Sequence, residues 1–433
     1  MTNQLTVLLN GREVGAVSYR NARISFHYDK VWRQDQDAYP LSLSMPLASA
    51  EHGHATVEAF LWGLLPDNDR VLNNWARRFQ VSARNAFRLI AHVGEDCAGA
   101  VQFVRPDRME TIHGKPGEIA WLTEDEIAER LRALRADHSA WRAASDTGQF
   151  SLAGAQPKTA LLLERSRWGI PSGRTPTTHI LKPPTGEWDG HAENEHFCLL
   201  LARASGLVVP NSRVRRFRNE IAIVIERYDR VRSSAGGWLR VHQEDMCQAL
   251  GLHPAQKYES EGGPGVLRIA DFLRENSSNP GEDVQAFLDA IAFNWLIAGT
   301  DGHAKNYALL LGARGAVRLA PLYDLASILP YRNIDVKKAK LAMKIGGEYR
   351  LANISMRNWR RLATEVGMEE ELIIDRLRAM TAGFPDLAAR IQNQVEAEGL
   401  SHPTVTTLAE RLKARSAACQ RLLEMGNRSI SHR

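Results

Sequence analysis

Two aspartates on either side of a short β-hairpin constrain this chain more than any other feature of its sequence. Asp301 lies in the loop Thr300–Asn306, after a segment with apolar residues at helical spacing. Tyr307–Leu311 and Val317–Leu322 are apolar runs joined by a glycine-containing turn, and Asp324 follows the second run. Because a hairpin returns the chain to where it started, we expect Asp324 to lie near the loop of Asp301.

The segment before this loop is predicted to be a buried helix that fixes the position of the loop. Apolar residues recur at helical spacing from Val284 to Ala298, Asp283 is a candidate N-cap, and Gly299 follows the end. Asp-Gly is a common turn dipeptide, so either Asp301 or Asp324 alone could be a turn or cap residue. Taken together, the two acids favour catalysis.

The order of these polar residues is the one that phosphoryl transfer from Mg-ATP requires. In protein kinases an aspartate accepts the proton of the acceptor hydroxyl, an asparagine five positions later holds one Mg²⁺, and a later aspartate holds the other. Asp301, Asn306 and Asp324 have this order and spacing. The pattern therefore predicts a kinase-type active site.

Composition sets the outer limits. A chain of 433 residues is expected to form two or three domains or lobes. With 44% hydrophobic and 24% charged residues it is typical of a globular protein, and neither an apolar run near membrane-spanning length nor a signal peptide is evident. The four cysteines lack metal-ligand spacing and indicate reduced thiols. We therefore expect a cytoplasmic protein that does not enter a membrane.

The formal net charge is +5, and its distribution is more informative than its size. Basic residues gather in three stretches: Arg213, Arg215, Arg216, Arg218, Arg227, Arg230 and Arg232; Arg357, Arg360 and Arg361; and Arg411, Lys413, Arg415, Arg421, Arg428 and Arg433. Scattered basic residues usually only form a hydrated surface, whereas clusters without matching acids could instead contact phosphates of ATP or of a nucleic acid. No zinc finger or RNA-binding motif indicates sequence-specific reading by this chain itself.

The periodicity predicts an α+β fold with a protein-kinase-like core of a β-rich and a helical lobe. Residues 1–105 are expected to form a small mixed domain, residues 106–149 a connecting segment with a helix, residues 150–230 the β-rich lobe, and residues 231–433 a mainly helical lobe. Within the first domain we expect a hairpin at Leu5–Leu9 and Val14–Tyr19, an extended segment at Ala22–His27, helices at Val57–Leu65, Val71–Phe79 and Ala86–Val93, and a strand at Ala98–Val104. Next come a connection at Glu110–Glu118 and a helix capped by Thr123 and Glu126 that extends to Ala136. The β-rich lobe is expected to hold strands at Thr159–Leu163, Thr178–Lys182, Arg213–Phe217 and Ile221–Ile225 and a helix from Glu193 to Ala204. After Arg230 the periodicity is almost wholly helical apart from the hairpin described above.

Candidate nucleotide-binding segments lie in the β-rich lobe. The loop 151–159 has one glycine, Gly154, and the cation Lys158, so it could hold phosphates but could equally be a plain turn. Lys182 ends a strand and precedes a helix with Glu195, or alternatively Glu193, as the partner that kinases give such a lysine. Glu226–Tyr228 has the position of an interlobe hinge, or is simply a charged strand end.

These segments together resemble the HipA toxins, serine/threonine kinases of bacterial type II toxin–antitoxin systems. The resemblance covers nearly the whole chain. It rests on Ala153–Thr159, Thr177–Lys182, Asn194-Glu195, Glu226–Arg230, Gln243–Met246, Gly262–Gly265, Thr300–Asn306 and Tyr323-Asp324, with Gly94–Gly99 similar to the N-terminal domain of the family. Pro157 stands where acidic residues also occur in the family, which leaves the detail of that loop open.

The resemblance implies a role for each matching position. Asp301 would be the catalytic base, Asn306 and Asp324 the magnesium ligands, and Ser151 the residue that is autophosphorylated, which ejects the phosphate loop and silences the kinase. The ATP site would comprise the phosphate loop with Ala153, Gly154, Ala155, Gln156, Pro157 and Lys158, then Lys182, the adenine hinge with Glu226, Arg227 and Tyr228, and His303, Ala304, Lys305, Asn306, Tyr323 and Asp324. Implied cofactors are ATP and Mg²⁺. Implied partners are a helix-turn-helix antitoxin, HipB, operator DNA bound through it, and a protein substrate of the translation machinery, typically an aminoacyl-tRNA synthetase. A small-molecule phosphotransferase and a non-catalytic corepressor are the alternatives.

Overall fold

The computed structural model describes residues 2–114, 117–138, 140, 150–184, 188–234 and 236–428, with side chains up to 424. Two compact units are present. The first comprises Met1–Pro183, Arg215–Ala255 and Ala308–Ala320, and the second comprises Pro184–Val214, Gln256–Tyr307 and Pro321–Arg433. The first unit thus contains the predicted N-terminal domain together with most of the predicted β-rich lobe.

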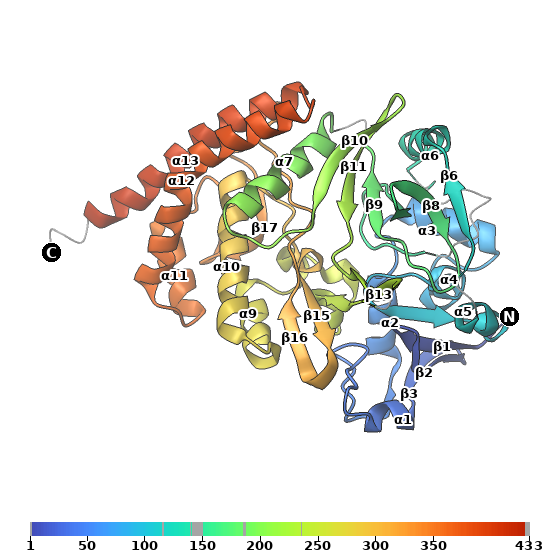
Figure 1. Ribbon diagram of the computed structural model, residues 1–433. Coiled ribbons are helices and arrows are strands. Elements are labelled where there is room, and N and C mark those ends of the chain that lie inside the picture. The colour runs from blue at the N-terminus through green and yellow to red at the C-terminus, as the bar shows by residue number, and fades with distance from the viewer. Residues whose placement is uncertain are drawn as a thin grey trace. The chain divides into compact units, whose positions relative to one another are not determined.

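An antiparallel sheet forms the beginning of the first unit, in the order β4-β3-β2-β1-β5 (Figure 1). Its strands are β1 (Gln4–Leu9), β2 (Arg12–Arg20), β3 (Arg23–Tyr28), β4 (Glu51–His52) and β5 (Val101–Val104), and its helices are α1 (Lys30–Gln34), α2 (His54–Gly63), α3 (Asp69–Phe79) and α4 (Ala86–Val93). Asn10 and Gly11 join β1 to β2 with φ of 49° and 81°. Positive φ at both central residues defines the type I′ turn that suits a hairpin, as the Asn-Gly dipeptide predicts.

A second sheet of the first unit has the order β10-β11-β9-β7-β8-β6. Its strands are β6 (Ile119–Leu122), β7 (Thr159–Glu164), β8 (Arg167–Pro171), β9 (His179–Lys182), β10 (Ser212–Phe217) and β11 (Glu220–Glu226). Helix α6 (Glu124–Ala136) begins with the predicted capping box of Thr123 and Glu126. The predicted plain connection at Glu110–Glu118 is wrong at its start, since α5 (Met109–His113) forms there. Lys115 and Pro116 of that connection lie outside the described residues.

Strands also occur where the sequence favoured helices, so that prediction is wrong for two stretches. One holds β12 (Arg230–Arg232), β13 (Trp238–Arg240) and β14 (His242–Asp245), and the other holds β17 (Lys340–Ile345) and β18 (Glu348–Arg350). The predicted hairpin after Asn306 is present as β15 (Ala308–Gly312) and β16 (Ala316–Leu319), and β14 pairs with β15. These strands are short, and their apolar positions do not distinguish them from helical turns.

The second unit is mainly helical. Its helices are α7 (His191–Ala204), α9 (Val266–Asn276), α10 (Pro280–Ile297), α11 (Met356–Glu365), α12 (Glu370–Ala397) and α13 (Pro403–Arg428), and α12 and α13 lie side by side (Figure 1). The expected buried helix is α10, but its N-cap is Asn279, because the helix begins one turn before Asp283, and Ala298 in the left-handed conformation ends it.

One member of the C-terminal basic stretch does not face solvent. The guanidinium of Arg415 donates to the carbonyls of Trp295 and Leu296 at the end of α10. A cation there satisfies helix carbonyls that have no partner within the helix and complements the helix dipole. Arg433, from the same stretch, lies outside the described residues.

Candidate active site

The loop of Asp301 is held by its own backbone and by the side chain of Asn306. The amide Nδ2 of Asn306 donates to the carbonyl of Asp301 at 2.8 Å, and the backbone N–H of His303 donates to the same carbonyl at 2.8 Å. Asn306 is 8% exposed, whereas the Asp301 side chain lies at the surface of its unit. Because the nitrogen of the Asn306 amide is engaged in the loop, its oxygen is the atom left to meet a cation.

Asp324 returns to this loop as the hairpin pattern predicts. The hydroxyl of Tyr323 donates to the carbonyl of Lys305 at 2.6 Å. Asn306 follows Lys305 in sequence and Asp324 follows Tyr323, so each is next to one of the two residues that this hydrogen bond joins. Asp324 has a φ of 54°, a left-handed conformation that is uncommon outside glycine and often marks functional sites.

His303 is the buried member of the loop. Its side chain is 5% exposed, and burial lowers its pKa below the ordinary value. Its ring packs edge-on against Tyr258, with 5.0 Å between ring centroids. His303 is thus an uncharged packing residue of the Asp301 loop at neutral pH.

The predicted phosphate loop lies in the first unit and closes on itself. The Nζ of Lys158 donates to the carbonyl of Ala153 at 2.7 Å. Gly154 has a φ of +101°, and a Cβ built on it would lie 2.7 Å from the Lys158 Nζ. A larger residue at position 154 would therefore be strained and would meet the ammonium group. Ala155, Gln156 and Pro157 complete this tight loop.

The N-terminal domain supplies the groups to which the phosphate loop is bonded. Gly154 forms a parallel β-bridge with Pro66, and its carbonyl accepts from the N–H of Asp67 at 3.1 Å. Just before the loop, the Ser151 N–H donates to the carbonyl of Asp96 at 3.0 Å, and the Ser151 Oγ donates to the carbonyl of Leu64 at 2.7 Å. Ser151 is 0% exposed.

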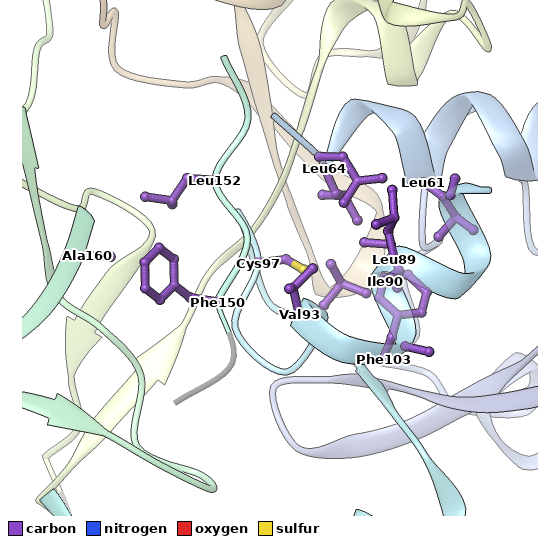
Figure 2. Close-up of a cluster of buried hydrophobic side chains, with 14 of the residues drawn as sticks. Leu61, Leu64, Leu89, Ile90, Val93, Cys97, Phe103, Phe150, Leu152 and Ala160 are labelled. Atoms are coloured by element: carbon purple, nitrogen blue, oxygen red, sulfur yellow. The ribbon is translucent and has the colours of Figure 1, made fainter. Parts of the chain in front are cut away.

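Apolar packing reinforces these hydrogen bonds. Phe150 and Leu152, on either side of Ser151, are each 4% exposed and belong to a hydrophobic cluster that the N-terminal domain shares with the second sheet. Figure 2 shows both side chains on the side of the segment that faces Ala160 of β7, with Cys97, Leu64 and Leu89 on its other side. The segment that carries Ser151, which the sequence indicated to be a loop, is therefore part of a core.

A buried group of charges surrounds Asp96. Its carboxylate accepts from Arg230 at 2.9 Å and from the hydroxyl of Thr177 at 2.7 Å, and it also pairs with Arg240 and Arg227. Burial alone would raise the pKa of Asp96, but the three guanidinium groups outweigh it and hold the pKa well below its ordinary value. Arg227 and Arg230 are each 4% exposed. They bind carboxylates inside the protein, so they are not part of a basic surface as the sequence suggested.

The strand lysine and the predicted hinge belong to neighbouring strands. Lys182 is the last residue of β9, is 3% exposed, and pairs with Ile223 of β11. At the end of β11, Glu226 is exposed, the N–H of Arg227 donates to the carbonyl of Thr178 at 2.9 Å, and the hydroxyl of Tyr228 donates to Gln243. Glu193 and Glu195, the two candidate partners of Lys182, are both buried in α7 of the second unit.

Comparison with known proteins assigns the chain to a family. A family model described as HipA-like C-terminal domain matches residues 150–388, and one described as HipA N-terminal domain matches residues 5–104. The chain belongs to the HipA family.

Full-length relatives support this assignment. The chain is 36% identical to the putative kinase Y4mE of Sinorhizobium fredii, over 89% of this chain and 91% of that protein. It is 29% identical to the serine/threonine-protein kinase toxin HipA of Shewanella oneidensis, over 90% of this chain and 89% of that protein. Its structure matches HipA in the complex of Shewanella oneidensis HipA, HipB and operator DNA, with a TM-score of 0.84, 25% identity, and coverage of 97% and 98%.

The family places the chain among the HipA-like toxin kinases and confirms the predicted fold class, a mixed α and β kinase-like fold with a HipA-type N-terminal domain. Within the described part of the chain, no helix has the length and apolar character needed to cross a membrane.

The sequence did not reveal two residues of the structure described above. Asp96 lies in the Gly94–Gly99 stretch that resembles the family, but its ion pairs form with residues far along the chain, and Tyr258 has no local pattern at all.

Proposed function

We propose that this HipA-family chain is a cytoplasmic Mg-ATP-dependent serine/threonine protein kinase that acts as the toxin of a toxin–antitoxin pair. The observation that carries the proposal is the return of Asp324 to the Asp301 loop, through the hydrogen bond from Tyr323 to Lys305. In this proposal the bond supports the approach of Asp324 to the loop of Asp301 and Asn306, and the three residues have the order that phosphoryl transfer uses.

In the proposed reaction, Asp301 accepts the proton of the substrate hydroxyl. The hydroxyl oxygen then forms a bond to the γ-phosphorus of ATP, and the bond from that phosphorus to the β-γ bridging oxygen breaks to release ADP. Asp301 suits this role because its carboxylate is exposed while its backbone is fixed by His303 and Asn306. Ala304 and Lys305 of the same loop are both buried.

Mg²⁺ fits the residues that would hold it. The amide oxygen of Asn306 and the carboxylate of Asp324 are hard oxygen ligands, and Mg²⁺ commonly takes one or two protein ligands and completes its shell with phosphate oxygens and water. Such an ion would neutralise charge on the transferred phosphate. Among the described residues no group of three or more histidine, cysteine or acidic side chains forms a richer metal site.

The nucleotide would be bound by the first unit's predicted segments. In this proposal the loop Ala153–Lys158 and Lys182 bind the phosphates, and the backbone of Glu226–Tyr228 binds adenine. Lys158 now donates to Ala153, so ATP would compete for its ammonium group. The substrate would be a protein of the translation machinery, with an aminoacyl-tRNA synthetase as the candidate that the family resemblance gives.

Ser151 is proposed as a site of autophosphorylation that silences the kinase. Its hydroxyl is fully buried and donates to the Leu64 carbonyl. A phosphoserine oxygen has no proton to donate there at neutral pH, and burial of its two charges without partners would be strongly unfavourable. Phosphorylation would therefore require the segment to leave its position and would prevent its return, which would displace the phosphate loop.

We further propose a helix-turn-helix antitoxin as partner and operator DNA bound through that complex. The support is the printed composition of the matching structure, which contains HipA, HipB and operator DNA. Of the basic residues singled out in the sequence, Arg213 and Arg216 are exposed and remain candidates for phosphate contacts.

The test is incubation of the purified protein with Mg-ATP, followed by mass spectrometry for phosphate on Ser151 and assay of phosphoryl transfer to protein. Asp301→Asn is expected to lower the rate at least ~100-fold, the scale of losing a general base, while leaving ATP affinity unchanged. Near-normal turnover of this variant would reject the role of Asp301. Phosphate found on a metabolite and not on protein would favour a small-molecule phosphotransferase, and binding of antitoxin without any transfer would favour a non-catalytic corepressor.

A further inference from the structure

The Asp301 carboxylate has a hydrogen-bond partner that no kinase motif supplies. The hydroxyl of Tyr258 donates to the Oδ1 of Asp301 at 2.7 Å. The other carboxylate oxygen, Oδ2, accepts no hydrogen bond from any residue that the structure describes. An exposed aspartate side chain would otherwise rotate between several rotamers. The Tyr258 bond fixes one oxygen and leaves Oδ2 to receive a proton.

Tyr258 lies in a turn that begins at Lys257. Two further contacts join this turn to the Asp301 loop. The N–H of Ala304 donates to the carbonyl of Lys257 at 3.1 Å. The Tyr258 ring packs on His303 at an interplanar angle of 81°, an edge-on arrangement that aromatic pairs favour. Backbone, ring and hydroxyl of this turn thus all contact the four-residue stretch from Asp301 to Ala304.

The glycine-rich stretch after Tyr258 explains why the turn has a fixed shape. The N–H groups of Glu261 and Gly263 both donate to the Tyr258 carbonyl, each at 3.0 Å. A Cβ on Gly263 would lie 2.0 Å from the Gln256 carbonyl oxygen, and one on Gly265 would lie 2.7 Å from the Glu259 carboxyl carbon. The backbone can close around Tyr258 only because Gly263 lacks a side chain, since its neighbour is backbone, whereas the Glu259 carboxylate beside Gly265 ends a flexible side chain.

We propose that Tyr258 is a positioning residue for catalysis. It holds Oδ1 of Asp301 so that Oδ2 faces the acceptor hydroxyl, and the turn that Gly262 and Gly263 form keeps Tyr258 in place. This inference rests on the proposed role of Asp301 as general base.

The test uses Tyr258→Phe, which removes the hydroxyl but keeps the ring against His303. Single-turnover autophosphorylation should slow about 10-fold, the scale of losing one hydrogen bond to a charged group. The KM for ATP and the melting temperature should not change, because the hydroxyl donates to the proposed base, which faces the acceptor hydroxyl and not ATP. Tyr349→Phe is the matched control, since Tyr349 on β18 belongs to the same unit and its charged neighbours are Lys344 and Glu259. It should react at the wild-type rate.

A double variant separates this inference from the proposed function. In an Asp301→Asn background, Tyr258→Phe should cause no further loss, because groups that act as one unit are not additive. If Tyr258→Phe alone keeps the wild-type rate or increases it, or if its effect persists in the Asp301→Asn background, Tyr258 does not act through Asp301. If Asp301→Asn itself keeps full activity, the proposed function fails, whatever Tyr258 does.

Discussion

The segment of Ser151 and the loop of Asp301 are the two predicted reactive regions of this molecule, and they are fixed in opposite ways. Phe150, Ser151 and Leu152 are buried and bonded to the N-terminal domain, which precedes the kinase core in sequence. The Asp301 carboxylate is exposed, and its loop is held by neighbours within the second unit.

This difference indicates different tasks. A loop fixed by short-range hydrogen bonds keeps one geometry, which suits a group that must meet each substrate in the same orientation. A segment that depends on another domain for its hydrogen bonds can be released as a piece, because local opening costs only the contacts of that piece. The N-terminal domain thus holds the Ser151 segment and the predicted phosphate loop through hydrogen bonds. The following changes test this comparison.

The largest effect is expected for Asp96→Asn. Removal of this buried charge leaves Arg230, Arg240 and Arg227 short of a partner, and the free energy of unfolding should fall by about 3–5 kcal/mol. Urea denaturation measures it. The control is Asp125→Asn, which breaks the exposed ion pair with Arg218 and should leave stability unchanged. Equal effects of the two variants would mean that the buried cluster does not stabilise the unit.

Phe150→Ala should open the Ser151 segment without unfolding the rest. Hydrogen exchange at the Ser151 amide should become faster, because the segment loses its main apolar anchor. Phe103→Ala is the control in the same hydrophobic cluster, on β5 of the N-terminal sheet. It should instead lower global stability by about 3–5 kcal/mol, the usual cost of a buried Phe→Ala change. If Phe150→Ala lowers global stability as much as Phe103→Ala, the segment is an inseparable part of the core.

The sequence predicted the two regions unequally, for a physical reason. Asp301, Asn306 and Asp324 are joined by a hairpin, so local patterns place them together. The surroundings of Ser151 depend on contacts with Leu64 and Asp96, more than 50 residues away in sequence. No periodicity records such pairing.

The same limit applies to single residues. Arg227 and Arg230 read as surface charge because their partner Asp96 is distant in sequence, and burial could not be inferred from composition. Short strands such as β12 and β13 were missed because two or three alternating residues carry no clear period. Asn279 replaced Asp283 as N-cap because Pro280 at the first helical position extends α10 by one turn.

Asp324→Ala sharpens the comparison on the catalytic side. Loss of a proposed metal ligand should weaken Mg-ATP binding by ~10-fold or more and should also lower turnover. Titration calorimetry with Mg-ATP measures the affinity. Asp301→Asn is the matched control, since it should lower turnover and leave affinity unchanged. Unchanged affinity in Asp324→Ala would assign Asp324 a structural role.

The smallest effect concerns a second set of hydrogen bonds made by the N-terminal domain, from Ser42 and Leu43 to Glu244 on β14. Its carboxyl accepts from the hydroxyl of Ser42 at 2.5 Å and from the N–H of Leu43 at 2.8 Å. Burial raises its pKa from 4.5 to about 8, and the nearby Asp245 acts in the same direction. The folded protein therefore keeps a proton that the unfolded chain releases. Glu244 contributes stability that is fully present below pH 4.5 and is lost as the pH rises through about 8.

Glu244→Gln should remove this dependence, because glutamine does not titrate and its amide can still hydrogen-bond Ser42 and Leu43. The free energy of unfolding of the wild type should fall relative to the variant between pH 7 and 8, with a slope of at most ~1.4 kcal/mol per pH unit. His242 on the same strand does not interfere in this window. Burial lowers its pKa from 6.5 to about 4, so its contribution changes only at lower pH. Parallel stability curves for the two proteins from pH 7 to 8 would show that Glu244 is already ionised in the folded state, and that this connection of the N-terminal domain is insensitive to pH.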